Sequence, residues 1–294
     1  MKKIIALCLL LSAALAFYFF KTPAVDQPNP FLYIPFWRTA TAQNVEDIIK
    51  QGYDINVSGK DGLTPLMIAI STESNVDIID LFLKNGADVH ARDDRGRTPL
   101  MIAALYTQDP KVIDSLIGYG ADIRESNITE WQPLMFAVSF NNNHEVIEAL
   151  LKHGADVHQK NRNGWTALML AGLVNENPKI IKALIDYGSD ISVRDNDNSS
   201  VLSLAATLNN NPEIIKFFIE QGLNVNEQNN DGQTPLIQAV RFNSNPKVAE
   251  TLLDHGANVK IKDNNGKTAL DYAKEEPDIL ATELYQELER LMSE

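Results

Sequence analysis

Short apolar runs alternate with polar segments along most of the chain, and the alternation keeps a fixed length. Residues 66–70 are all apolar, a polar break follows at 71–75, and apolar side chains then return at helical spacing from Val76 to Leu83. An uninterrupted apolar run predicts a helix buried on most sides, whereas spacing by three and four positions predicts an amphipathic helix. We therefore expect a short buried helix followed by an amphipathic one.

The ends of both helices carry matching signals. Thr64 is a good N-cap residue, and Pro65 suits the first helical position. Gly86 follows the second helix, where a residue in the left-handed conformation commonly ends a helix. The sequence therefore predicts a complete helix pair between Thr64 and Gly86.

This pair recurs every 34 residues. A triplet close to Thr-Pro-Leu opens the first helix of each copy, at 64–66, 98–100, 132–134, 166–168, 200–202, 234–236 and 268–270. A glycine ends the second helix, at Gly52, Gly86, Gly120, Gly154, Gly188, Gly222 and Gly256. Such a period predicts a stack of small units, none of which can bury its apolar face alone.

A polar turn joins successive copies, at 93–96, 161–164, 229–232 and 263–266. With the segments 86–89 and 154–157, both Gly-Ala-Asp-Val, these residues resemble the ankyrin repeat over about residues 30 to 275. The resemblance implies an all-α solenoid of helix-turn-helix units linked by hairpin-like loops. The tetratricopeptide repeat has the same period but lacks the Gly-capped second helix and the turn loop.

Two features depart from the ankyrin pattern. Each copy is one residue longer than the usual 33, and the extra residue lies between the two helices, as in 141–144. The histidine that usually follows Thr-Pro-Leu is absent, and methionine takes its place in four copies, at Met67, Met101, Met135 and Met169. We expect apolar packing there instead of a threonine–histidine hydrogen bond.

The ends of the array differ from its middle, as expected for a solenoid. We assign 31–61 to an N-terminal capping repeat, 62–276 to the repeats and 277–294 to a C-terminal capping helix, preceded in the chain by a leader at 1–20 and a spacer at 21–30. The capping helix is expected to turn five apolar side chains inward: Ile279, Leu280, Leu284, Leu288 and Leu291.

The leader predicts export. Lys2 and Lys3 precede the uncharged run Ile4–Phe20, and a small-x-small triplet ends at Ala16. Cleavage after Ala16 would yield a periplasmic or secreted protein, whereas retention of Ile4–Phe20 would anchor it in the inner membrane with the repeats facing the periplasm. The compact leader favours a bacterial source. Both alternatives place the repeats outside the cytoplasm.

Composition points away from several functions. A formal net charge of −13 disfavours nucleic acid and anionic lipid as partners, and the single cysteine, Cys8, lies in the leader. The few histidines follow the repeat lattice without metal-ligand spacing, and no phosphate-binding glycine loop occurs. We therefore expect no enzyme activity, no cofactor and no metal.

The candidate binding residues lie at two repeat positions. The position before each triplet varies along the chain, holding Leu63, Arg97, Trp131, Trp165, Ser199, Gln233 and Lys267. This variation suggests that packing does not set these side chains, and the resemblance implies that they border a concave groove. The second position is apolar, and either packs the lengthened helix or adds to the groove: Tyr106, Phe140, Val174, Leu208 and Phe242.

We expect Trp131 and Trp165, flanked by Arg97, to anchor a protein ligand, because tryptophan is a favoured interface residue. Arg95, Arg97 and Arg241 are expected at the rim of the groove, with ordinary solvated charges as the alternative. The predicted function is non-catalytic protein–protein binding by a monomer. The alternatives are binding of a cell-wall or glycan polymer through the same groove, and action on a host protein as a secreted effector.

Overall fold

The computed structural model describes residues 29–73, 75–280 and 282–294, and in these residues the fold is helical with no strand. The leader, with Ile4–Phe20, lies outside the described residues. The chain divides into two compact units, unit 1 up to Asp156 and unit 2 from Val157. None of the described helices has the length and apolar character needed to cross a bilayer.

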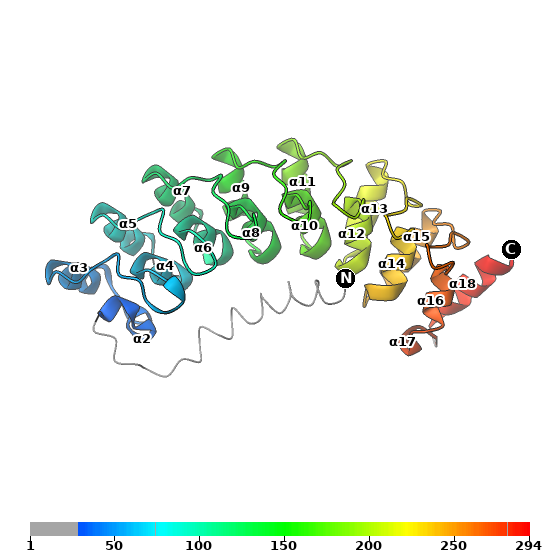
Figure 1. Cartoon of the computed structure of the whole chain (residues 1–294), viewed down its shortest axis with the longest axis horizontal. Helices are drawn as coiled ribbons and strands as arrows, with labels where there is room; N and C mark the ends of the chain where they lie inside the picture. The colour runs from blue at the N-terminus through cyan, green and yellow to red at the C-terminus, as the bar shows by residue number, and fades with distance from the viewer. Residues whose placement is uncertain (1–28, 74, 281) are drawn as a thin grey trace. The chain divides into compact units, whose positions relative to one another are not determined.

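Unit 1 consists of helix pairs stacked in sequence order (Figure 1). Its helices are α2 (Ile34–Trp37), α3 (Ala42–Lys50), α4 (Pro65–Ser71), α5 (Val76–Lys84), α6 (Pro99–Tyr106), α7 (Pro110–Gly118), α8 (Pro133–Phe140) and α9 (His144–Lys152), with the short 3-10 helices η1 (Pro30–Leu32) and η2 (Lys60–Gly62). The first helices α4, α6 and α8 pack on one another, and the second helices α3, α5, α7 and α9 form a parallel row.

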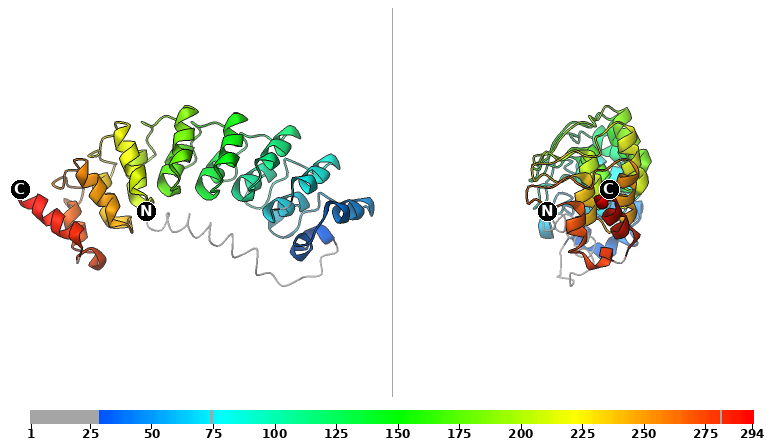
Figure 2. Two further views of the ribbon diagram at one scale, coloured as in Figure 1. Left: turned by 180° about the vertical axis from the view of Figure 1, so that it is seen from behind. Right: turned by 90° about the vertical axis from the view of Figure 1, so that its right-hand side faces the viewer.

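Unit 2 repeats the arrangement (Figure 2). Its helices are α10 (Ala167–Val174), α11 (Pro178–Asp186), α12 (Val201–Leu208), α13 (Pro212–Glu220), α14 (Pro235–Phe242), α15 (Pro246–Asp254), α16 (Ala269–Ala273), α17 (Pro277–Leu280) and α18 (Glu283–Ser293). Helices α10, α12, α14 and α16 form the row of first helices.

The expected caps are present. The Thr64 hydroxyl accepts a hydrogen bond from the Met67 N–H, and Pro65 occupies the first turn of α4. Met67 is fully buried, so apolar packing fills the place of the usual histidine. A feature not predicted is the cap of the second helix, where Asn143 accepts from the Glu145 N–H and equivalent Asn or Asp residues do the same in the other repeats.

Four successive repeats carry an asparagine just after their first helix, and we call these residues the asparagine ladder: Asn141, Asn175, Asn209 and Asn243. The Asn209 amide nitrogen donates to the carbonyl oxygens of Gly172 and Asn175 in the preceding repeat, at 2.8 and 2.9 Å, and its Oδ1 accepts from the Asn211 N–H. Asn209 is 1% exposed. Buried carbonyls need such partners, so Asn209 ties its repeat to the preceding one, as Asn243 does in unit 2 and Asn141 in unit 1.

The C-terminal cap differs from the expectation of one helix from Pro277 to Met292. The structure has two helices, α17 and α18, and the Thr282 side chain caps the second by accepting from the Tyr285 N–H. Leu284 and Leu288 are buried as predicted, but the placement of Leu280 is wrong because its side chain is 44% exposed. The new helix start at Thr282 changes which side chains face α16.

Candidate functional site

The side chain before each triplet is fixed by the turn loop behind it. In the turn of residues 93–97, the Asp93 Oδ1 accepts from the backbone N–H groups of Arg95 and Arg97, at 2.9 and 2.8 Å. The first residue of each later turn repeats this double bond: Asn127, Asn161, Asp195, Asn229 and Asp263. The turn therefore sets the direction in which the next side chain leaves the backbone.

Where that first turn residue is aspartate, its second oxygen binds a side-chain donor. The donor is the Arg97 Nε for Asp93 at 2.7 Å, the Trp165 indole N–H for Asp195 at 2.9 Å, and the Tyr272 hydroxyl for Asp263 at 2.6 Å. Where the first turn residue is Asn161 or Asn229, its side-chain amide nitrogen is buried and has no hydrogen-bond partner among the described residues. Aspartate thus stands first in the turns where a side-chain donor lies close to its second oxygen.

The expectation that packing does not set the position before the triplet is wrong at most copies. Five of its seven side chains are at most 8% exposed: Leu63, Arg97, Trp165, Ser199 and Gln233. Only Trp131 and Lys267 are partly exposed. The variation along the chain reflects different buried partners rather than an unconstrained surface.

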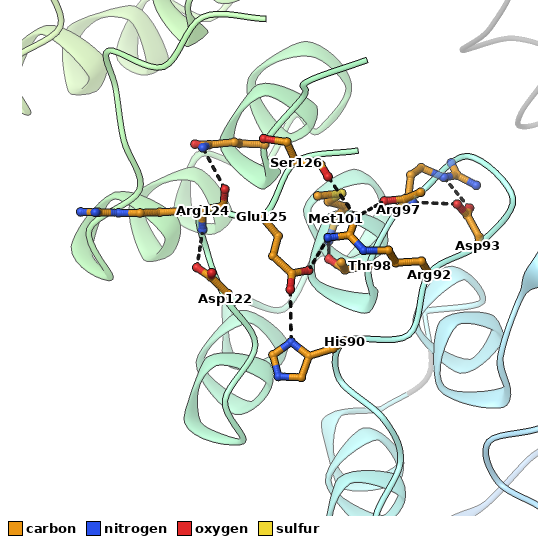
Figure 3. Close-up of polar contacts among 12 residues, drawn as sticks. His90, Arg92, Asp93, Arg97, Thr98, Met101, Asp122, Arg124, Glu125 and Ser126 are labelled. Carbon is orange, nitrogen blue, oxygen red and sulfur yellow. Dashed lines mark hydrogen bonds and ion pairs between the residues drawn. The ribbon is translucent and has the colours of Figure 1, made fainter. Parts of the chain in front are cut away.

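Arg97 shows this most clearly, and the expectation that it lies at a groove rim is not met. Its residue is 4% exposed, and its guanidinium pairs with Asp93 inside its own turn (Figure 3). Burial raises the pKa of the Tyr106 hydroxyl, and the nearby guanidinium groups of Arg97 and Arg95 partly oppose that rise. Arg97 therefore supports Tyr106 and the turn. The Arg95 side chain, in contrast, is exposed and donates no hydrogen bond among the described residues.

Figure 3 also shows how the neighbouring loop is held. Glu125 faces both the His90 Nδ1 and the Arg92 guanidinium at 3.3 Å, and Arg92 donates to the carbonyl oxygen of Ser126. These bonds join two successive loops of unit 1.

Trp131 is the one tryptophan of the predicted pair that unit 1 contains. Its ring stacks on Phe140, with 6.0 Å between centroids and 18° between planes, and lies 5.3 Å from the Phe136 ring. Trp131, Phe140 and Tyr106 are all partly exposed. Within the described residues the Trp131 indole N–H meets no acceptor. We name Arg95, Tyr106, Trp131 and Phe140 the aromatic patch.

Trp165 belongs to unit 2 and is 8% exposed. Its hydrogen bond to Asp195 uses the only donor of the ring. The remaining predicted residues, Arg241 and Phe242, lie at the end of α14, far along the chain in the same unit. Of the eight sequence-predicted residues, five belong to unit 1 and three, Trp165, Arg241 and Phe242, belong to unit 2.

The described residues hold no cluster of three His, Cys, Asp or Glu side chains suited to a metal ion. Sequence reasoning missed the asparagine ladder and the buried Ser203–Thr207–Gln238 network, in which the Gln238 Oε1 accepts from both hydroxyls at 2.9 and 2.8 Å. The signal for the ladder was the recurrence of Asn at every 34th position.

Comparison with known proteins agrees with the geometry. None of the curated proteins compared with the chain matched it significantly. A family model described as ankyrin repeats (3 copies) matches residues 38–127, 106–195 and 202–284. These matches cover most of the chain, and they include the Thr-capped first helices, the Gly-ended second helices and the loops between them. The chain belongs to the ankyrin-repeat family.

Proposed function

We propose that this protein is a non-catalytic interaction scaffold that binds a protein ligand through the aromatic patch of unit 1. Ankyrin repeats generally mediate protein–protein interaction. The observation that carries the proposal is Trp131, a partly exposed indole that stacks on Phe140 and whose N–H meets no acceptor in the described part of the chain. A large ring held in place loses little conformational entropy on binding, and tryptophan is enriched among interface anchors.

The backbone beside Trp131 supports the same conclusion. Glu130 adopts a left-handed conformation with φ +65°, at a position where five other turns carry glycine. Such strain costs on the order of 1 kcal/mol for a residue with a Cβ, and strained residues cluster at functional sites. Arg95 adds a cation whose charge acts on the Tyr106 hydroxyl, so an acidic or carbonyl-rich segment of the ligand fits this patch.

Crosslinking pull-down from the native envelope tests the proposal. Trp131→Ala is expected to weaken ligand binding by about 2 kcal/mol, roughly thirtyfold, because it removes the anchor. The matched control is Tyr119→Ala, which removes an exposed ring (43%) at the C-cap of α7, away from the patch. Equal capture by both variants contradicts the proposal. Co-sedimentation of the purified protein with cell wall, lost in Trp131→Ala, would instead favour a polymer ligand.

We further propose that the chain is exported from a bacterial cell. The support is the order of two lysines, an uncharged run and a small-x-small triplet in residues 2–20. N-terminal sequencing of the mature protein distinguishes the two forms. A start at Phe17 indicates a soluble periplasmic or secreted protein, whereas retention of Met1 in a membrane fraction indicates an anchor. Recovery of the intact chain in the cytosol contradicts export.

A further inference from the structure

Arg241, at the end of α14, lies against two aromatic rings. The Arg241 guanidinium carbon lies over the Tyr272 ring at 4.2 Å from its centroid, and over the Phe242 ring at 4.7 Å. Tyr272 belongs to α16, which packs on α14. Two rings from neighbouring first helices therefore hold one guanidinium.

The Tyr272 ring is itself fixed. It is 6% exposed, and its hydroxyl donates to Asp263, which also accepts from the Asn265 and Lys267 backbone. A second cation, the Lys267 Nζ, lies 5.0 Å from the same ring centroid, and it is paired with Glu275. The ring thus attracts two positive charges, of which one is already neutralised.

Arg241 lacks such a partner. Among the described residues, no carboxylate or carbonyl accepts a hydrogen bond from its guanidinium. The side chain is also partly exposed, so a ligand can reach it. A guanidinium lying over a ring contacts it through its face, and its N–H groups remain free for acceptors. They form a planar fork that matches the two oxygens of a carboxylate.

The arrangement is particular to this repeat. The positions equivalent to Arg241 in the two preceding repeats are Leu173 and Thr207, and those equivalent to Lys267 are Ser199 and Gln233. A stacked cation without a partner is also unusual on a chain with net charge −13. An acidic ligand segment would be repelled by most of the surface and attracted here, which favours a single register of binding.

We propose that Arg241, held by Tyr272 and Phe242, binds a carboxylate of an acidic segment of the protein ligand. This second contact site lies in unit 2 and rests on the proposed scaffold function, but not on the aromatic patch. The carboxylate can be a Glu or Asp side chain or a free C-terminus, since both present the same two oxygens.

Three pentapeptides distinguish these sources when titrated against the full chain. The first is Gly-Ala-Glu-Phe-Gly, blocked at both ends; the second replaces Glu with Gln; the third is the Gln peptide with a free C-terminal carboxylate. The Arg241 Nε–H NMR resonance, assigned from its loss in Arg241→Lys, reports binding. The internal control is Arg124, an exposed arginine whose side chain has no ring contact or hydrogen-bond partner among the described residues and extends away from its loop in Figure 3.

The Glu peptide, the free-carboxylate peptide or both are expected to bind about tenfold or more tightly than the blocked Gln peptide, with the resonance of Arg241 shifting well beyond that of Arg124. Arg241→Gln should abolish the preference while leaving the helical circular dichroism unchanged. Equal affinity for all three peptides, equal shifts at Arg241 and Arg124, or a preference that survives Arg241→Gln overturns the proposal. None of these outcomes depends on capture by Trp131, so failure here leaves the scaffold proposal to its own test.

Discussion

Trp131 in unit 1 and Trp165 in unit 2 occupy the same repeat position but have different surroundings. Trp165 is 8% exposed and donates its indole hydrogen to Asp195. Trp131 is partly exposed and stacks on Phe140, and its indole N–H has no acceptor among the residues that the structure describes. The residue before Trp165 is Gly164, which takes the left-handed conformation without strain, and the residue before Trp131 is Glu130, which does not. The same repeat position therefore holds a buried, hydrogen-bonded ring in one unit and a partly exposed ring in the other.

The largest expected difference is in how much the free energy of unfolding falls when each ring is removed. Trp165→Ala should destabilise unit 2 by about 3–5 kcal/mol, because it empties a buried site. Trp131→Ala should cost unit 1 roughly 1 kcal/mol, since part of its ring already contacts solvent. Urea titration followed by far-ultraviolet circular dichroism measures both midpoints. Similar losses would remove the distinction between the two rings.

Removing only the indole donor isolates the hydrogen bond. Trp165→Phe should cost about 2 kcal/mol, because it removes a bond to a carboxylate and leaves the Asp195 Oδ2 without its donor. Trp131→Phe should change the stability by less than about 0.5 kcal/mol, as for substitutions without a broken buried contact. A loss in Trp131→Phe as large as in Trp165→Phe would show that Trp131 has a structural partner after all.

The turns before the two rings should respond in opposite directions. Glu130→Gly should stabilise the protein by about 1 kcal/mol by removing left-handed strain. Gly164→Ala should destabilise it by more than about 1 kcal/mol, since its φ is +79° and an added Cβ would lie 2.8 Å from the Asn196 backbone nitrogen. Thermal unfolding of the two variants tests the pair, and destabilisation by Glu130→Gly would contradict strain at the aromatic patch.

The smallest effect concerns pH, at Tyr272, the second ring that donates to a turn carboxylate. Burial raises the pKa of Asp263, but hydrogen bonds from Tyr272 and from the Lys267 and Asn265 backbone outweigh it and hold the pKa below its ordinary 3.8. A lowered folded-state pKa stabilises the fold above the unfolded value, and that stabilisation disappears as the pH falls through 3.8 and below.

Tyr272→Phe should therefore reduce the acid-induced loss of stability by about 1 kcal/mol between pH 5 and pH 2, by removing one of these bonds. Urea midpoints at a series of pH values measure the slope. An unchanged slope would show that the backbone donors alone hold the pKa of Asp263 down.

The repeated helix pair could be predicted because its signals are local. Thr64, Pro65 and Gly86 mark the ends of helices through bonds made within a few residues, and the structure confirms them. The site was harder to predict because burial of Arg97 and Trp165 depends on acceptors in turn loops, one of them 30 residues away in Asp195. Variation at one position indicated exposure, although different buried partners produce the same variation.

The asparagine ladder has a consequence for how the array could lengthen or shorten. Because Asn243 donates to the Ala206 and Asn209 carbonyls as Asn209 does to those of Gly172 and Asn175, excising one whole period from unit 2 would bring a new amide opposite carbonyls of the same kind. Cutting one residue more or fewer would leave those oxygens facing the wrong side chain. Duplication or loss of gene segments is thus restricted to whole repeats, because only whole repeats keep each asparagine amide opposite the matching carbonyl oxygens.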